Sequence, residues 1–130
     1  SGYNDQQTRV PFVLWVPGRS PQVIDRLTSH VDVPATFLPL LGVTNPASDY
    51  SQGESLYDAT RRGYTLICSW NDMAYVTEDW KVVIPTRTYN FVRQPVTTGD
   101  DRPVEDAENF YATHKEQLLS VIRDLKRFKE

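Results

Sequence analysis

The chain has 130 residues, of which 39% are hydrophobic and 12% aromatic, and this composition suffices for one domain with a modest core. Its formal charge of −3, with Lys and Arg spread along the chain, excludes the basic patch by which domains bind nucleic acid. No apolar run approaches the roughly 18 to 20 residues that span a bilayer, and the N-terminus lacks a signal-peptide pattern, so we expect a soluble segment. The single cysteine, Cys68, excludes an internal disulfide.

An apolar run from Val10 to Val16 follows a short polar N-terminus. Consecutive β-branched and aromatic side chains are typical of a strand that is buried on both faces in a parallel or mixed sheet. Pro17 and Gly18 should end this strand in a turn. Because so few residues precede it, we expect the chain to be the tail of a larger protein whose other strands cover this one.

A short helix is predicted from Val33 to Leu41. Asp32 is suited to cap it, and Pro34 falls in its first turn, where a missing N–H costs nothing. Gly42 is well placed to end it. Since the helix is apolar almost all round, we expect it to be buried.

Turn-forming residues fill 45–63, which we interpret as a loop that crosses the surface. Short strands follow, and Asn71-Asp72 and Glu78-Asp79 are predicted to be two-residue hairpin loops between the first three of them. The predicted strands form an antiparallel meander: Tyr64–Trp70, Met73–Thr77, Trp80–Ile84 and Thr88–Val92.

A polar loop, 95–104, precedes a long helix that is predicted from Glu105 to Lys129. Acidic residues at its start and basic residues at its end suit the helix dipole. We expect the helix to cover one face of the meander, because its apolar residues recur at spacings of three and four. They are Phe110, Tyr111, His114, Leu118, Val121, Ile122, Leu125 and Phe128.

These elements predict an α/β fold that becomes α+β in its C-terminal half. Residues 1–44 form a strand and a buried helix, and 45–63 form a connecting loop. Residues 64–130 form a four-stranded antiparallel sheet that is covered by a long C-terminal helix.

Several short motifs in the first 42 residues resemble the C-terminal end of the sulfatase-like proteins in the alkaline phosphatase superfamily. In that family an Arg-x-Pro leads into an apolar strand that ends in Pro-Gly, and Asp introduces a short helix that ends in Gly. The resemblance implies the C-terminal portion of an alkaline-phosphatase-like fold, in which 1–44 is the last strand-helix unit of the α/β core. The matching residues are Arg9-Val10-Pro11, Pro17-Gly18, Asp32, Pro34-Ala35-Thr36 and Leu40-Leu41-Gly42.

Within that family, residues 46–53 and 61–64 look most like the YejM-type inner-membrane proteins of Gram-negative bacteria. This resemblance implies a noncatalytic fragment of a periplasmic domain, on the periplasmic face of the inner membrane, in a protein linked to outer-membrane lipid and lipopolysaccharide balance. The alternative is the C-terminal part of an active metal-dependent sulfatase or phosphoglycerol transferase. Intact upstream metal ligands and a nucleophile would favour that alternative.

The family places its nucleophile, acidic metal ligands and Asp-His pair upstream of the apolar strand. Residues 1–8 hold neither Lys nor His. We therefore expect no catalytic, cofactor-binding or metal-binding residue in this chain, and a divalent metal only in the full-length parent. The expected partners are the rest of the parent domain, a second copy of the chain through bare strand edges, and an anionic lipid or a sulfate or phosphate ester through the parent.

The acidic residues that could bind a metal ion are better explained by structural roles. His30 and Asp32 supply two ligands where a metal site needs three or four, so we interpret Asp32 as a helix cap. Asp100-Asp101 and Glu105-Asp106 lack the order of a calcium loop and are predicted to be a solvated helix start.

Other polar side chains also favour structural roles. Cys68 alternates in register with apolar neighbours and should be a buried thiol, and His114 should be a packed histidine. Three arginines could hold a sulfate or phosphate group, but a solvated surface explains them better: Arg19, Arg61 and Arg62. Most large aromatics are predicted to be core residues, with Trp80 partly exposed: Trp15, Trp70, Trp80 and Tyr75.

Overall fold

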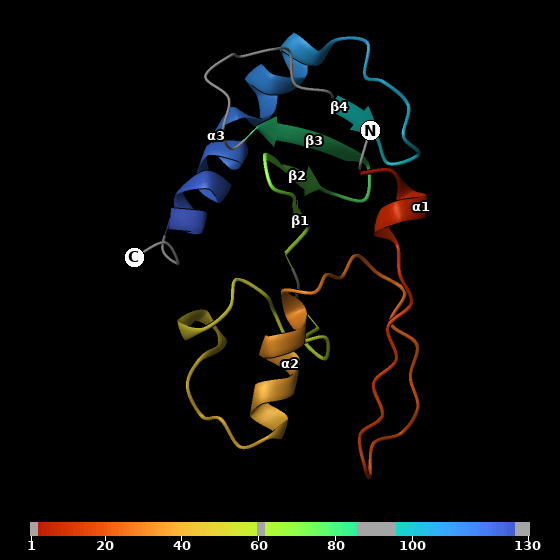
Figure 1. Ribbon diagram of the computed structural model, residues 1–130, viewed down its shortest axis with the longest axis vertical. Coiled ribbons are helices and arrows are strands. Elements are labelled where there is room, and N and C mark those ends of the chain that lie inside the picture. The colour runs from red at the N-terminus through yellow and green to blue at the C-terminus, as the bar shows by residue number, and fades with distance from the viewer. Residues whose placement is uncertain (1–2, 60–61, 86–95, 127–130) are drawn as a thin grey trace.

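The computed structural model describes residues 3–59, 62–85 and 96–126, and side chains as far as residue 124. Figure 1 shows a sheet that lies between α1 and α3, with α2 set apart from it and a long loop curving round α2. This mixture of helices and an antiparallel sheet is an α+β arrangement. The elements in chain order are α1 (Asp5–Thr8), α2 (Asp32–Leu40), a 3₁₀ turn (Ala47–Asp49), β1 (Thr65–Cys68), β2 (Asp72–Val76), β3 (Trp80–Pro85), β4 (Val96–Thr98) and α3 (Ala107–Lys126).

Residues 9–29, which we call the arm, run away from α1, reverse direction and return to α2 (Figure 1). The reversal is a turn in which Pro17 precedes Gly18, whose φ is 76°. Arg19 N donates to Val16 O across it at 3.2 Å. Pro followed by a residue of positive φ is typical of a type II turn, so the predicted break at these residues is confirmed.

The buried strand predicted over Val10–Val16 is wrong for this structure. No strand pairs with this segment within the described part of the chain, and Val13 and Trp15 are 90% and 81% exposed. An apolar run becomes a strand only where another backbone accepts and donates its hydrogen bonds. Trp15, predicted to be a core residue, therefore lies at the surface.

The helix predicted over Val33–Leu41 is confirmed as α2, shifted by one residue at each end. Gly42 follows its C-terminus with φ 92° and donates to Pro39 O at 3.1 Å, while Val43 N donates to Leu38 O at 3.0 Å. These two bonds form the Schellman arrangement, in which glycine takes the left-handed position.

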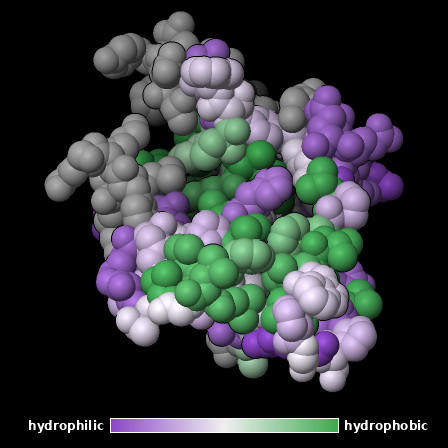
Figure 2. Space-filling model, turned by 60° about the horizontal axis from the view of Figure 1, so that its bottom comes forward, coloured by the Kyte–Doolittle hydropathy of each residue, from purple (hydrophilic) through white to green (hydrophobic). Residues whose placement is uncertain are grey.

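Burial of α2 on all sides is not observed. Ala35 and Thr36 are buried, but Phe37, Leu40 and the adjacent Leu41 are exposed. The lower end of Figure 1, where the arm reverses and α2 ends, comes forward in Figure 2, and hydrophobic side chains cover much of this face. The described chain therefore covers only one side of the helix.

The strands of the sheet follow one another in the order β1-β2-β3-β4, and all neighbours are antiparallel. The first three confirm the predicted meander, including the short turn between β2 and β3, where Thr77 N donates to Trp80 O at 2.8 Å. The predicted strand Thr88–Val92 lies outside the described residues. The predicted polar loop 95–104 is wrong in part because it contains β4, in which Val96 pairs with Val82.

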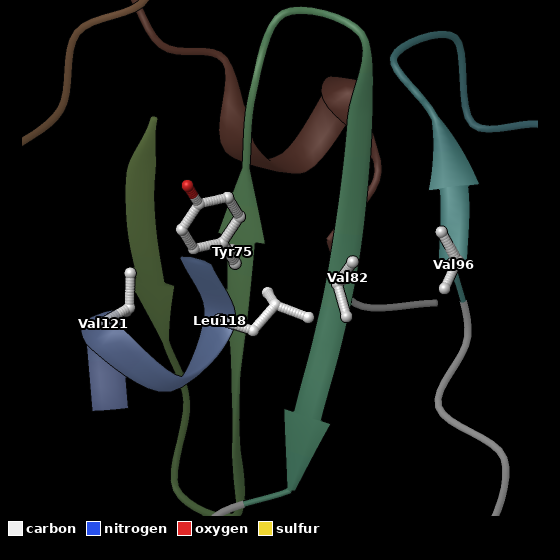
Figure 3. Packing of buried hydrophobic residues seen from close by; sticks show 5 residues of the cluster. All are labelled: Tyr75, Val82, Val96, Leu118 and Val121. Carbon is white, nitrogen blue, oxygen red and sulfur yellow. The ribbon is translucent and has the colours of Figure 1, made fainter. Parts of the chain in front are cut away.

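One face of the sheet packs against α3, which confirms the predicted covering helix. Leu118 and Val121 of α3 meet Tyr75, Val82 and Val96 from three different strands (Figure 3). Burial raises the pKa of Tyr75 to about 12. This face holds the larger of the two buried clusters.

The opposite face of the sheet is covered by the N-terminal part of the chain. Tyr3 is buried there against Ala74 and Val76, and Leu27 from the returning limb of the arm packs on the same cluster. Alternate residues of β2 thus face two separate cores, as the period of a strand requires. The arm is attached to the sheet on this side.

Candidate functional site

Asp32 is the first residue of α2, and its side chain is fully buried. One carboxylate oxygen accepts from Ser29 N at 2.9 Å, and the other accepts from Glu54 N at 2.9 Å. The capping prediction was therefore wrong in detail, because Val31 occupies the cap position. The Asp32 side chain instead accepts hydrogen bonds from the arm, at Ser29, and from the loop, at Glu54. A negative charge at this end of a helix also suits its dipole.

Arg62 forms an ion pair with Asp32, with Nη2 and Oδ1 3.0 Å apart. Its other nitrogens donate to Gln52 O and Tyr64 O, each at 2.7 Å. The guanidinium is thus bonded in three directions, and its side chain is 11% exposed. Three carbonyl and carboxylate partners hold it in a structural position, which differs from the solvated surface expected for this arginine.

The other two arginines considered for anion binding give no shared site. Arg19 lies over the Tyr57 ring, 3.7 Å from its centroid, in a cation–π contact. Arg61 lies outside the described residues. The structure therefore does not bring Arg19 and Arg62 to one ligand.

A cleft of about 230 Å³ lies beside Arg62, between the loop and α3. The loop is held against α2 on its inner side, because Ser51 Oγ donates to Val31 O at 2.6 Å and Leu56 N donates to Thr36 Oγ1 at 2.9 Å. The loop and α2 are therefore packed together, and Asp32 and Arg62 lie where they meet, beside the cleft. Apolar and polar groups line the cleft together, among them Glu54, Tyr64, Leu66, Val121 and Asp124.

Gly53 of the loop lies close against the backbone of Val31 and Asp32 at the start of α2. A Cβ built at this position would fall 1.8 Å from Val31 O, so no larger residue fits without a shift of backbone. Ser51 Oγ also accepts from Gly53 N at 2.9 Å, which closes a tight turn. The serine is thus occupied by the backbone of its own turn, as its interpretation as part of a loop predicted.

The described side chains form no arrangement for metal binding. No group of three or more His, Cys, Asp or Glu among them is placed to hold an ion, so they do not fit the divalent metal implied for the parent. His30 is exposed at the start of α2 while its neighbour Asp32 is buried. The two residues do not form a pair.

His114 is a packed histidine, as predicted. Its ring stacks on Phe110 at a centroid distance of 4.2 Å and lies 4.9 Å from the Trp80 ring, and Nδ1 is 2.9 Å from Phe110 O. Trp80 itself is half-buried, which confirms its expected partial exposure.

Cys68 is exposed, so its prediction as a buried thiol is wrong. It is the last residue of β1, which lies at the edge of the sheet. Strand alternation predicts toward which face of the sheet a side chain points, but it does not predict whether other elements cover that face at this position. Trp70, predicted to be a core residue, is also exposed in the turn that follows.

Lys81 is the centre of a charged cluster that the sequence reasoning missed. Its Nζ lies 2.5 Å from Asp5 Oδ1 and 2.6 Å from Asp101 Oδ1, and its side chain is 4% exposed. A lysine within the apolar strand Trp80–Pro85 was the available signal, because buried lysines require partners. Asp101, predicted to be solvated, is therefore engaged with the sheet.

The charged cluster changes the pKa values of Lys81 and Asp101. Burial lowers the pKa of Lys81, but its hydrogen bonds to Asp101 and Asp5 outweigh this effect, so the pKa lies above its ordinary value. The hydrogen bond from Lys81 holds the pKa of Asp101 below its ordinary value. Both directions favour the ionised cluster.

The first 43 residues match the family model described as Sulfatase. They include the arm and α2, where the exposed apolar side chains gather, together with Asp32. The match supports a place for this chain among sulfatase-family sequences. It confirms the family resemblance of the N-terminal motifs.

Curated relatives extend the similarity over almost the whole chain. The inner membrane protein YejM of Salmonella typhimurium is 44% identical over 126 residues, which is 92% of this chain, and that of Salmonella typhi is identical to the same extent. The findings together support a YejM-like fragment of the sulfatase family. The chain spans about a fifth of the length of these relatives, and none of its described helices has the length and apolar character needed to cross a membrane.

Proposed function

We propose that this chain is a noncatalytic C-terminal part of a periplasmic sulfatase-like domain, in a protein of the inner membrane. The similarity to YejM over 92% of the chain supports this proposal. Its structural role is to dock onto the rest of that domain, here called the remaining sulfatase-like part. Residues 1–44 then belong to an alkaline-phosphatase-like core, and 64–130 form a small subdomain beside it.

The distribution of apolar side chains carries the proposal. The sheet and α3 bury a core of their own, whereas the stretch that matches the Sulfatase model exposes Val13, Trp15, Val23 and Phe37. Soluble domains rarely leave so many large apolar side chains exposed in one stretch unless another surface covers them. The covering surface is then the remaining sulfatase-like part.

Backbone groups of the arm support the same partner. Residues 10–15 have no backbone–backbone hydrogen bond to any described residue. Pairing with a sheet of the remaining part would satisfy these groups and bury the apolar side chains on both faces. The segment would then become the strand that its sequence predicts.

We expect any catalytic residues of the parent to lie outside this chain. Its described residues lack a metal-binding cluster, and a metal-assisted ester cleavage needs a nucleophile and metal ligands together. We propose for the parent a role in outer-membrane lipid and lipopolysaccharide balance, with anionic lipid as the partner. The Sulfatase match favours a second function, an active hydrolase or transferase for sulfate or phosphate esters.

Docking is tested by mixing the 130-residue chain with a second chain that carries the remaining sulfatase-like part. We expect association that buries Trp15, seen as a blue shift of tryptophan emission in a Trp70→Phe background. Trp15→Ser should weaken the complex, while Lys115→Ser, on the exposed side of α3, should not. Absence of association, or equal binding by both variants, would refute the docking role.

Activity separates the two parent functions. Aryl sulfate and phosphodiester hydrolysis by the full-length parent is measured with and without divalent metal, beside this chain alone. Metal-dependent turnover by the parent supports the enzyme, and absence of turnover supports the noncatalytic role. Turnover by the 130-residue chain itself would contradict both.

A further inference from the structure

We infer that the charged cluster around Lys81 is a positioning device that holds the start of the arm, so that its apolar tip is presented to the remaining sulfatase-like part. This inference rests on the proposed function for its partner. The holding of the arm itself can be tested without that partner.

The first attachment fixes residues 3–8 to the sheet. Lys81 lies on β3 and binds Asp5 of α1, Asp101 beyond β4 and, at 3.4 Å, the carbonyl oxygen of Tyr3. The Tyr3 hydroxyl donates to the Asp72 carboxylate on β2. A buried ammonium that loses a partner is less well compensated, so removal of Asp5 should loosen this attachment.

The second attachment fixes the returning limb. Arg26 Nη2 donates to Leu56 O and Asp58 O, each at 2.8 Å. Leu27 packs on the sheet beside Tyr3, and Ser29 N donates to Asp32. The two ends of the arm are therefore bound to the same body.

Between these attachments, Arg9 Nε pairs with Asp5 Oδ2 at 2.7 Å, and Arg19 lies 3.7 Å from the centroid of the Tyr57 ring. Val10, Phe12, Val13, Trp15 and Val23 are all exposed. Most polar bonds thus lie toward the ends of the arm, and the apolar side chains on either side of its turn stay exposed. This division is the one expected of a segment that is held in place so that something else can cover it.

The occupant is the remaining sulfatase-like part. The curated relatives are about five times as long as this chain, and the Sulfatase match includes the whole arm. Ordering a free segment on binding costs conformational entropy, which a segment that is already held does not lose again. Release of the first attachment should therefore weaken docking without removing any contact side chain.

Arm mobility is the first test. A nitroxide is attached at Val13→Cys in a Cys68→Ser background, and its electron paramagnetic resonance spectrum is recorded for the 130-residue chain. We expect faster motion when Asp5→Ala is added and no change with Asp100→Ala, whose carboxylate pairs with Arg102 instead. Tyr3→Phe, which keeps the ring, is a milder second variant should Asp5→Ala fail to fold.

Affinity for the remaining sulfatase-like part is the second test. Asp5→Ala should weaken binding by about tenfold or more, the equivalent of ordering a few side chains, and Asp100→Ala should not weaken it. If the wild type binds and Asp5→Ala binds with the same affinity, the positioning role is overturned and the proposed function stands. Failure of the wild type to bind would overturn both, and superimposable resonance spectra would by themselves overturn the holding of the arm.

Discussion

At the scale of single residues, the Asp32–Arg62 ion pair should be sensitive to substitution, because the Asp32 side chain is fully buried. Arg62→Met would remove a cation that pairs with a fully buried carboxylate, although two backbone N–H groups still bind this carboxylate. Removing one member of a buried ion pair typically costs about 3 to 5 kcal/mol. We expect a loss of this order in the free energy of unfolding, measured by urea titration.

The control for this substitution is Arg123→Met. Arg123 is exposed on α3, and its nearest carboxylate partner is 3.9 Å away, so its contribution should be close to zero. Equal stability of the two variants would show that Arg62 does not support Asp32.

Asp101 should make the free energy of unfolding decrease as the pH falls. Lys81 lowers its pKa in the folded chain, so the unfolded chain takes up this proton first as the pH falls. The contribution is fully present above the ordinary value of about 4 and is lost as the pH falls through the lower, folded value. Urea midpoints between pH 6 and acid should therefore fall less steeply for Asp101→Asn than for the wild type.

The comparison variant for the acid profile is Glu105→Gln. It removes a carboxyl close in sequence that takes no part in the Lys81 cluster. A profile of Asp101→Asn that is as steep as the wild-type profile would contradict the role of Lys81.

At the scale of elements, α3 offers a matched pair of neighbouring leucines. Leu118 is buried against the sheet, whereas Leu119 is 41% exposed. Leu118→Ala should cost about 2 to 5 kcal/mol because it leaves a cavity, and Leu119→Ala should cost much less. Thermal or urea unfolding checks the difference, and similar losses would mean that α3 does not pack as described.

The elements that the sequence predicted well are those that depend on local pattern. The period of α3, the glycine after α2 and the short turn between β2 and β3 are each set by residues a few positions apart. β4 was missed because Val96–Thr98 is a very short strand, and only pairing with β3 identifies it. Strand pairing joins distant residues, which a local pattern does not contain.

At the scale of the whole molecule, the exposed arm should make the isolated chain associate with itself. We expect sedimentation velocity to show oligomers that grow with concentration, because apolar surface and unpaired backbone groups are exposed together. Val13→Lys should reduce this association, and Lys115→Ser should not. A monomer at all concentrations would count against an unpaired arm.

The candidate site was only partly visible in the sequence. Asp32 was singled out, but as a cap, and Arg62 was considered only as a surface anion binder, since nothing local shows that they lie 3.0 Å apart. Lys81 gave a weak signal as a charge in an apolar strand, while its partners lie 76 and 20 residues away. Long-range ion pairs are fixed by the packing of elements, so the sequence names candidates without joining them.

The sequence by itself determined α2, α3, most of the sheet and the family resemblance, because periodicity, turn residues and short motifs are local properties. Only the tertiary structure decided which apolar residues are buried. Most of Val10–Val16 and the outer side of α2 have the composition of a core, yet they are exposed, since burial requires a second surface. The same requirement explains why Lys81 is buried and Cys68 is not: the cover over each position is made by parts of the chain that are far away in sequence.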